Sequence, residues 1–225
     1  MIAAALLPAT GPAADHVAEL VALLGLLALA PAALVLLTSF LKMVVVLSIA
    51  RSALGAPQVP PSTAVTGLAL ALSFLVMAPV AERAAALGAA RPGEIGVAGA
   101  AARLSRAAGP VREFLSRFAR EDDRAAFLDV ARRLRPPEAE PAGEDDLAVL
   151  APAFVVSELR RAFTIGFVVF VPFLAVDLVV ANVLLALGLT QLSPTSVALP
   201  FKLLLFVAVD GWRLLARALA LSYAG

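Results

Sequence analysis

The residues in this sequence that could do chemistry are charged side chains inside or beside long apolar runs. They are Lys42, Arg51, Glu158, Arg160, Arg161, Asp177, Lys202 and Asp210. An ionisable side chain is costly in lipid, so a chain keeps one where it faces protein or water. We therefore expect these residues to form buried charge contacts between helices or subunits, or to mark a path for ions.

Composition argues against several classes of catalytic chemistry. The chain has no Cys, and its single His is His16. Disulfides, Cys-based zinc sites and Cys nucleophiles are therefore excluded, and a His-dependent triad is improbable. The net charge is only +1, which argues against a nucleic-acid partner. We expect a protein that is not an enzyme and that has no catalytic, cofactor-binding or metal-binding residues.

The elements that carry these charges are those of an integral membrane protein. Hydrophobic residues make up 61% of the chain, and the mean hydropathy is +0.94, whereas a soluble domain is about half apolar. We expect an all-α fold with four apolar helical segments arranged as two hairpins. The expected divisions are a leader (1–19), a first hairpin (20–81), a polar helical insert (82–150) and a second hairpin (151–225).

Local signals set these boundaries. Residues 20–41 form an uncharged run, and its length is enough to cross a bilayer core of about 30 Å as a helix. The helical pattern continues to residue 54, where Gly55 and Pro57 are typical of a helix end. A helix over residues 20–54 is longer than a membrane is thick, so we expect it to tilt, break or project. From Glu82 to Arg161 the chain has 13 basic and 13 acidic residues, which marks a change to polar surroundings.

The last apolar run has a regular charge pattern. At about 100° per residue, an unbroken helix would place Lys202, Asp210, Arg213 and Arg217 within an arc of about 80°. We expect this stripe to be buried against protein or to line an aqueous passage, because its central part would not be tolerated in lipid.

At this point several long blocks, in the right order, resemble the FliP/SctR family, which includes YscR and HrcR. The first is TSFLKMVVVLSIARSALG (38–55), followed by the Pro60-Pro61 pair. The others are MAPV (77–80), VREF (111–114), AFL (126–128), PAFVVSELRRAF (152–163), DLVVAN (177–182), LPFKLLLF (199–206) and DGW (210–212). The resemblance covers about residues 34–222.

The resemblance implies a core membrane protein of the type III secretion export apparatus. It also implies that the protein crosses the bacterial inner membrane several times and forms a homopentamer there. Members of the family assemble with SctS and SctT into a cone-shaped gate, which SctU and SctV join. Unfolded protein substrates pass through its centre. The family also implies that the polar insert is periplasmic and that the apolar helices are largely buried among subunits. Besides these proteins, we expect contact with membrane lipid.

One turn departs from the family pattern. Many members, especially flagellar ones, carry a run of methionines after the Ala-Leu-Gly that ends the third apolar segment. Here the matching residues are Leu189, Thr190 and Gln191. The resemblance makes these three residues pore-lining candidates without the flexible methionine gasket; the competing interpretation is a plain turn between helices. The turn and the lack of a predicted signal peptide favour the injectisome (virulence) branch.

Three functions are compatible with these features. The first is a pore-forming structural subunit without catalysis. The second is an independent ion- or proton-coupled transporter that uses Asp177 as its relay carboxylate. Transporters usually show internal repeats, and no clear repeat is present. The third, an intramembrane enzyme, lacks a suitable His base and metal ligands.

Overall fold

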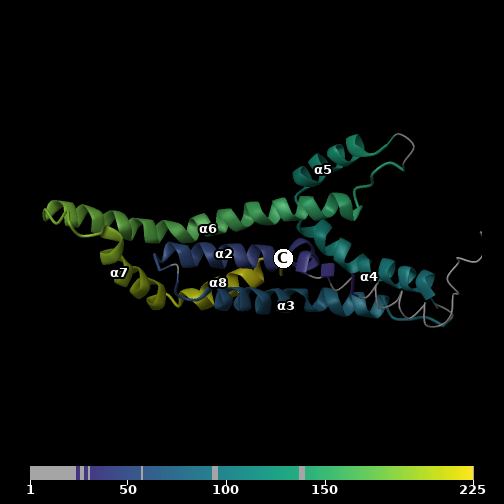
Figure 1. The fold of residues 1–225 in the computed structure, drawn as a ribbon, viewed down its shortest axis with the longest axis horizontal. Coiled ribbons are helices and arrows are strands. Elements are labelled where there is room, and N and C mark those ends of the chain that lie inside the picture. The colour runs from purple at the N-terminus through teal and green to yellow at the C-terminus, as the bar shows by residue number, and fades with distance from the viewer. Residues whose placement is uncertain are drawn as a thin grey trace, which may run out of the picture.

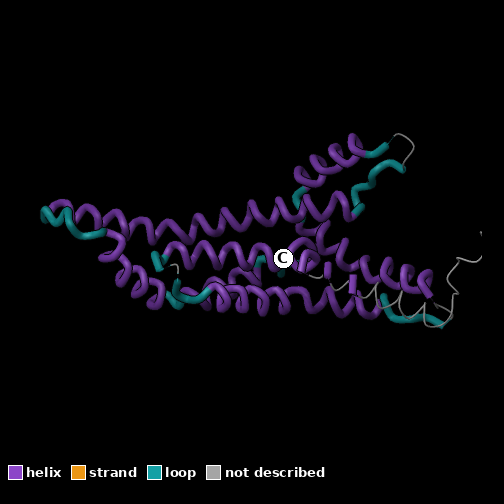
Figure 2. The backbone as a smooth tube through the Cα atoms, viewed as in Figure 1, coloured by secondary structure: helices purple, strands orange, loops and turns teal. Residues whose placement is uncertain are grey.

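The described part of the chain is built from helices joined by short loops. The computed structural model describes residues 24–25, 28–29, 31–56, 58–92, 96–136 and 140–224, and no strand occurs among them (Figure 2). The predicted leader, residues 1–19, lies outside the described residues. The all-α prediction is therefore confirmed.

The labelled helices α2 to α8 follow one another along the described chain. They are α2 (Phe40–Ala53), α3 (Ser62–Leu87), α4 (Gly96–Phe118), α5 (Glu121–Leu134), α6 (Leu147–Ala186), α7 (Pro194–Ala208) and α8 (Gly211–Leu221). A shorter helix, Pro31–Leu37, precedes α2 and meets it at 84°. The long first helix expected from the sequence is thus broken at Thr38–Ser39, seven residues after Pro31.

The helices form an elongated bundle with α2 at its centre. Helix α2 packs against α6 on one side and against α3 on the other (Figure 1). Helix α4 contacts both α3 and α6, while α5 lies on α6, and α7 and α8 return along the bundle toward α3. The core residues of α2 include Met43, Val46, Leu47 and Ala50, which are fully buried. This arrangement places α2 between α3 and α6, and α6 in turn contacts α4, α5 and α7.

Helices α2 and α6 approach closely because α6 carries a glycine at their contact. A Cβ added at Gly166 would lie 2.5 Å from Cδ1 of Ile49 and 3.2 Å from its Cβ. Such distances are far shorter than ordinary van der Waals contact, so only glycine fits unless the helices separate. Small residues allow this kind of close helix packing in membrane proteins.

We predict that Gly166→Ala destabilises the chain by about 1–3 kcal/mol, the usual cost of an overpacked contact. The double variant Gly166→Ala/Ile49→Ala is expected to recover much of that loss, because it removes Cδ1 and Cγ2 of Ile49, the two atoms nearest to the added Cβ. Gly67→Ala is the matched control, since nothing lies within 4 Å of a Cβ at Gly67. Thermal unfolding of the detergent-solubilised protein, followed by circular dichroism, measures all three. Equal midpoints for the Gly166 and Gly67 variants would contradict the close approach.

The long helix α6 begins directly after Asp146, whose carboxylate is hydrogen-bonded to the preceding loop. The Asp146 carboxylate accepts a hydrogen bond from the Gly143 backbone N–H at 3.1 Å and from the Arg135 guanidinium at 2.7 Å. These two donors lower the pKa of Asp146, the backbone N–H contributing most. The carboxylate therefore stays ionised where the helix dipole favours a negative charge.

Helices α3 and α6 are long and apolar enough to cross a membrane, and the bent pair that includes α2 would make a third. The fourth apolar segment, α7, is helical but only 15 residues long. At about 1.5 Å per residue, α7 is too short to cross a bilayer core of about 30 Å. Within the described residues, each of the four expected apolar segments is thus represented by helix, with two or three of spanning length.

Candidate functional site

The centre of the bundle contains a set of ionisable side chains, which we call the ion cluster: Lys42, Glu158 and Tyr223, which are buried, and Arg161, which is 37% exposed. Nζ of Lys42 lies 3.2 Å from Oε2 of Glu158, and both side chains are only 1% exposed. Nη1 of Arg161 lies 2.8 Å from Oε1 of the same carboxylate. The cluster therefore joins α2 to α6 through one carboxylate that is contacted on both oxygens.

Tyr223, just after α8, ties the end of the chain into this cluster. Its hydroxyl donates to Oε2 of Glu158, and its ring lies 3.5 Å from Nζ of Lys42, a cation–π contact. The ring also packs against Phe114 and Phe118 of α4. Burial, reinforced by the Glu158 carboxylate, raises the pKa of the Tyr223 phenol. The phenol therefore stays protonated and remains a donor.

The ion cluster also provides a hydrogen-bond donor for a backbone carbonyl at the end of α4. Nη1 of Arg161 donates to the carbonyl oxygen of Phe118 at 2.7 Å. The last carbonyls of a helix have no partner within it, so a cation is favourable at this position. Four segments thus meet at the cluster: α2, α4, α6 and the residues after α8.

A second polar contact fixes the insert on α6. The backbone N–H of Arg120 donates to Oγ of Ser157 at 2.8 Å, and that hydroxyl donates to Oδ2 of the buried Asp123 at 2.7 Å. The exposed Arg160 lies 3.6 Å from the other oxygen of Asp123. The turn between α4 and α5 is therefore held on α6 by Ser157, the residue directly before Glu158.

The second buried charge pair joins α6 to α7. Nζ of Lys202 lies 2.6 Å from Oδ2 of Asp177, with the lysine side chain 4% exposed and the aspartate 32% exposed. The other aspartate oxygen, Oδ1, is buried without a hydrogen-bond partner. A Cβ at Gly55 would lie 3.7 Å from the same Nζ, so the end of α2 also approaches this pair. The charge partner of Asp177 is therefore on its own chain.

The two remaining charged candidates are Arg51 and Asp210. Arg51, in the last turn of α2, is half-buried, and its Nε has no hydrogen-bond partner. Asp210 is exposed and lies 3.4 Å from the exposed Arg213.

The expected charge stripe on one unbroken helix is wrong. The last run breaks between α7 and α8, where Asp210 adopts the left-handed conformation at a φ of 52°. A Cβ at the next residue, Gly211, would lie only 2.2 Å from the Phe206 ring. Trp212 packs edge-on against that ring at 5.1 Å between centroids. The DGW block therefore makes a corner, which leaves Lys202 buried and Arg213 exposed.

The predicted pore-lining residues occupy the tip between α6 and α7. Gly188 has a φ of 70°, its N–H donates to the Leu185 carbonyl, and the Leu189 N–H donates to the Leu184 carbonyl at 2.9 Å. This pattern is a Schellman motif. Helix α7 then begins at Pro194. Leu189, Thr190 and Gln191 are all exposed at the far end of the bundle (Figure 1).

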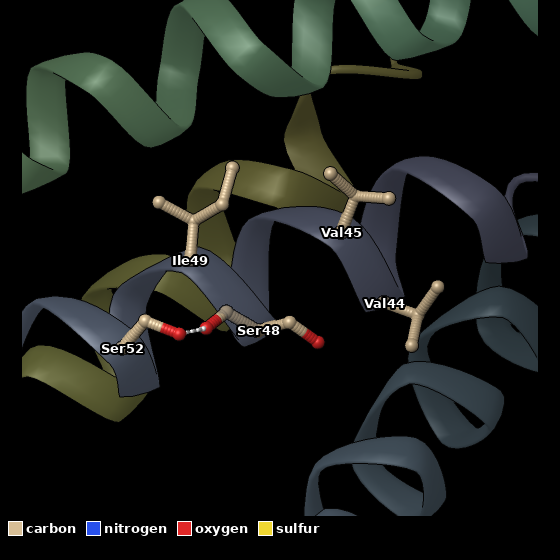
Figure 3. Close-up of a pocket in the computed structure, with 5 residues that line it drawn as sticks. All are labelled: Val44, Val45, Ser48, Ile49 and Ser52. Atoms are coloured by element: carbon tan, nitrogen blue, oxygen red, sulfur yellow. Dashed lines mark hydrogen bonds between the residues drawn. The ribbon is translucent and has the colours of Figure 1, made fainter. Parts of the chain in front are cut away.

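A shallow apolar groove runs along the open side of α2. Its volume is about 290 Å³, and it is lined by Val44, Val45, Ser48, Ile49 and Ser52 (Figure 3). The Ser52 hydroxyl donates to the Ser48 carbonyl oxygen at 2.9 Å, so its polar group is satisfied within the helix. The groove has no ionisable lining residue and is suited to contact with another apolar surface.

Much of the apolar surface of the chain has no partner within it. In the most apolar stretch of α6, only 11% of the residues are buried. The exposed apolar side chains of α6 include Phe163, Phe167, Val168, Leu178 and Val179. Exposed apolar areas of this extent mark contact with lipid or with other protein.

Three site residues were missed by sequence reasoning: Tyr223, Ser157 and Asp123. Tyr223 is the only tyrosine of the chain and follows the last apolar run, which is a usable but weak signal. Ser157 and Asp123 carry no signal of their own, because their pairing depends on how the insert folds back onto α6.

The comparisons with known proteins agree on one family. Residues 23–219 match the FliP family. The chain is 48% identical over 195 residues to "Flagellar biosynthetic protein FliP" of Pectobacterium carotovorum, covering 86% of this chain and 73% of the relative. It is 43% identical over 210 residues to "Hypersensitivity response secretion protein HrcR" of Ralstonia nicotianae, covering 92% and 97%. It is 42% identical over 209 residues to "Yop proteins translocation protein R" of Yersinia pestis, covering 92% and 96%.

Proposed function

The chain belongs to the FliP family, and from this premise we propose that it is a pore-forming structural subunit of a type III secretion export gate. In this proposal, unfolded protein substrates cross the bacterial inner membrane through a ring of five copies, and the chain is a multi-pass protein there. The chain is a membrane protein of the secretion-apparatus family.

The single observation that carries the proposal is the bare apolar surface of α6. Only 11% of the residues in the most apolar stretch of α6 are buried within the chain. A free-standing bundle would not leave so much of its most apolar stretch uncovered. In the proposal, lipid, other copies and the small subunits SctS and SctT cover this surface. SctU and SctV join the same assembly.

The position of the α6–α7 tip supports the pore-lining role of Leu189, Thr190 and Gln191. The Schellman motif at Gly188 fixes the direction in which the chain leaves α6. The exposed side chains at the tip are free to meet a substrate. Thr and Gln are polar, so a constriction built from them tolerates water better than a methionine ring does.

The injectisome branch remains our preference within this proposal. It rests on the Leu-Thr-Gln turn in place of methionines. The identities do not separate the branches, since the flagellar relative is 48% identical and the two secretion relatives are 43% and 42%.

We predict that a cysteine at Gln191 crosslinks to a substrate stalled in the gate. The chain has no native Cys, so Gln191→Cys introduces one unique reactive thiol. A secreted substrate that carries one cysteine behind a tightly folded plug would be held in the channel and joined by oxidation.

Leu134→Cys is the matched control for this crosslink, because Leu134 is highly exposed but lies at the end of α5. The proposal expects a strong crosslink at residue 191 and about tenfold less at residue 134, since crosslinking follows proximity. Equal crosslinking at both positions, or none at residue 191 in an assembled complex, would overturn the pore-lining assignment.

A further inference from the structure

A basic pocket opens where α2, α4 and α6 meet, beside the ion cluster. Its volume is about 520 Å³. Five of its nine lining residues are cations: Lys42, Arg117, Arg120, Arg160 and Arg161. No acidic residue lines it. A surface of this composition suits an anion that can accept several guanidinium hydrogen bonds.

The carboxylates that pair with these cations leave the lining basic. Glu158 contacts Lys42 and Arg161 but is fully buried in the core. Asp123, which lies near Arg160, is also buried. Asp122 pairs with Arg120 in an exposed contact that water screens. The side chains of Arg120 and Arg160 are well exposed, so both can turn toward a ligand.

An apolar ridge begins directly at this pocket. At about 100° per residue, Arg160, Thr164, Phe167, Val171, Leu174 and Leu178 fall within an arc of about 80° on α6. All six are exposed. From Arg160 to Leu178 the ridge is about 27 Å long at 1.5 Å per residue. A cationic head followed by an uncovered apolar ridge is the pattern of a site at the membrane interface.

We propose that the basic pocket binds the phosphate headgroup of an anionic phospholipid whose acyl chains lie along this α6 ridge. Charge complementarity favours the headgroup, and the ridge distinguishes a lipid from a free phosphate, which would leave the apolar side chains uncovered. The proposal does not depend on the export function, because it rests only on the fold of one chain. The site would hold α4, α5 and α6 in a fixed position at the membrane surface.

Native mass spectrometry of the full-length protein in detergent tests this site. The probes are phosphatidylglycerol and phosphatidylcholine with identical acyl chains. The wild-type chain is expected to retain phosphatidylglycerol about tenfold more than phosphatidylcholine, as basic residues near a membrane surface attract anionic lipid. The variant Arg120→Gln/Arg160→Gln is expected to lose most of that preference.

A matched control changes two cations away from the pocket. Arg213→Gln/Arg217→Gln alters exposed residues of α8 and is expected to bind phosphatidylglycerol as the wild type does. Phe167→Ser keeps the pocket and interrupts the apolar ridge, so it should lower retention of both lipids. Helical circular dichroism confirms that each variant is folded before the lipid measurement.

Several outcomes would overturn the proposal. Equal retention of the two lipids by the wild type is one, and equal loss in the pocket and α8 variants is another. Full displacement of phosphatidylglycerol by millimolar inorganic phosphate would indicate a simple anion site. If the pocket variant binds lipid normally but no longer associates with other subunits, the pocket accepts a carboxylate from a neighbouring protein instead.

Discussion

Replacing Glu158 with glutamine is expected to destabilise the folded chain by about 3–5 kcal/mol, the usual cost of leaving a buried charge without its partner. Glutamine has nearly the same shape, so no cavity forms. The Lys42 ammonium would remain fully buried, because both side chains are only 1% exposed. The Tyr223 hydroxyl would also lose its charged acceptor. Titration of the detergent-solubilised protein with sodium dodecyl sulfate, followed by helical circular dichroism, measures the change.

Two further variants separate charge from shape in this prediction. Lys42→Met/Glu158→Gln removes the lysine charge as well, and it is expected to regain most of the stability, because a neutral replacement of a buried pair is often tolerated. Glu113→Gln is the control, since the Arg83–Glu113 pair is exposed on both sides and is worth about 0–1 kcal/mol. A loss for Glu158→Gln no larger than that control would contradict the role given to the ion cluster.

Asp177→Ala is expected to cost about 3 kcal/mol, at the low end of the range for a broken buried pair. Lys202 would keep its charge with its side chain 4% exposed. The reverse variant, Lys202→Met, is expected to cost less, about 1 kcal/mol, because the Asp177 side chain that it leaves unpaired is 32% exposed, against 4% for Lys202. The asymmetry between the two variants, measured by the same unfolding titration, is the specific prediction.

Arg213→Gln is the matched control for this pair, since Arg213 and Asp210 are both exposed. It should change stability by less than about 1 kcal/mol. We also expect Asp177→Ala to weaken the assembly with other subunits, because α7 would no longer be held against α6. If Lys202→Met proves the more damaging change, the burial of the lysine is not what determines the energetics of the pair.

The helices could be predicted from the sequence because their signals are local. The apolar runs, the charged insert and the stops at Gly55 and Gly188 each need only a few neighbouring residues. The sequence also indicated that the first helix would tilt, break or project, and the structure shows a break at Thr38–Ser39.

The charge partners could not be predicted in the same way, since they depend on contacts between distant segments. Lys42 and Tyr223 meet at Glu158 only when α2, α6 and the end of the chain are packed together. The stripe on the last run failed for the same reason. Periodicity assumes a continuous helix, whereas the contact between Gly211 and the Phe206 ring, with Asp210 in a left-handed conformation, makes a corner.

The central claim is that this chain is one subunit of a closed assembly whose other members cover its apolar surface. Native mass spectrometry of the full-length protein, expressed alone and then with SctS and SctT, tests it most directly. We predict a discrete complex of five copies that gains both small proteins on co-expression. A stable monomer or dimer that binds neither of them would contradict the account, and would direct attention to Asp177 as the carboxylate of an independent transporter.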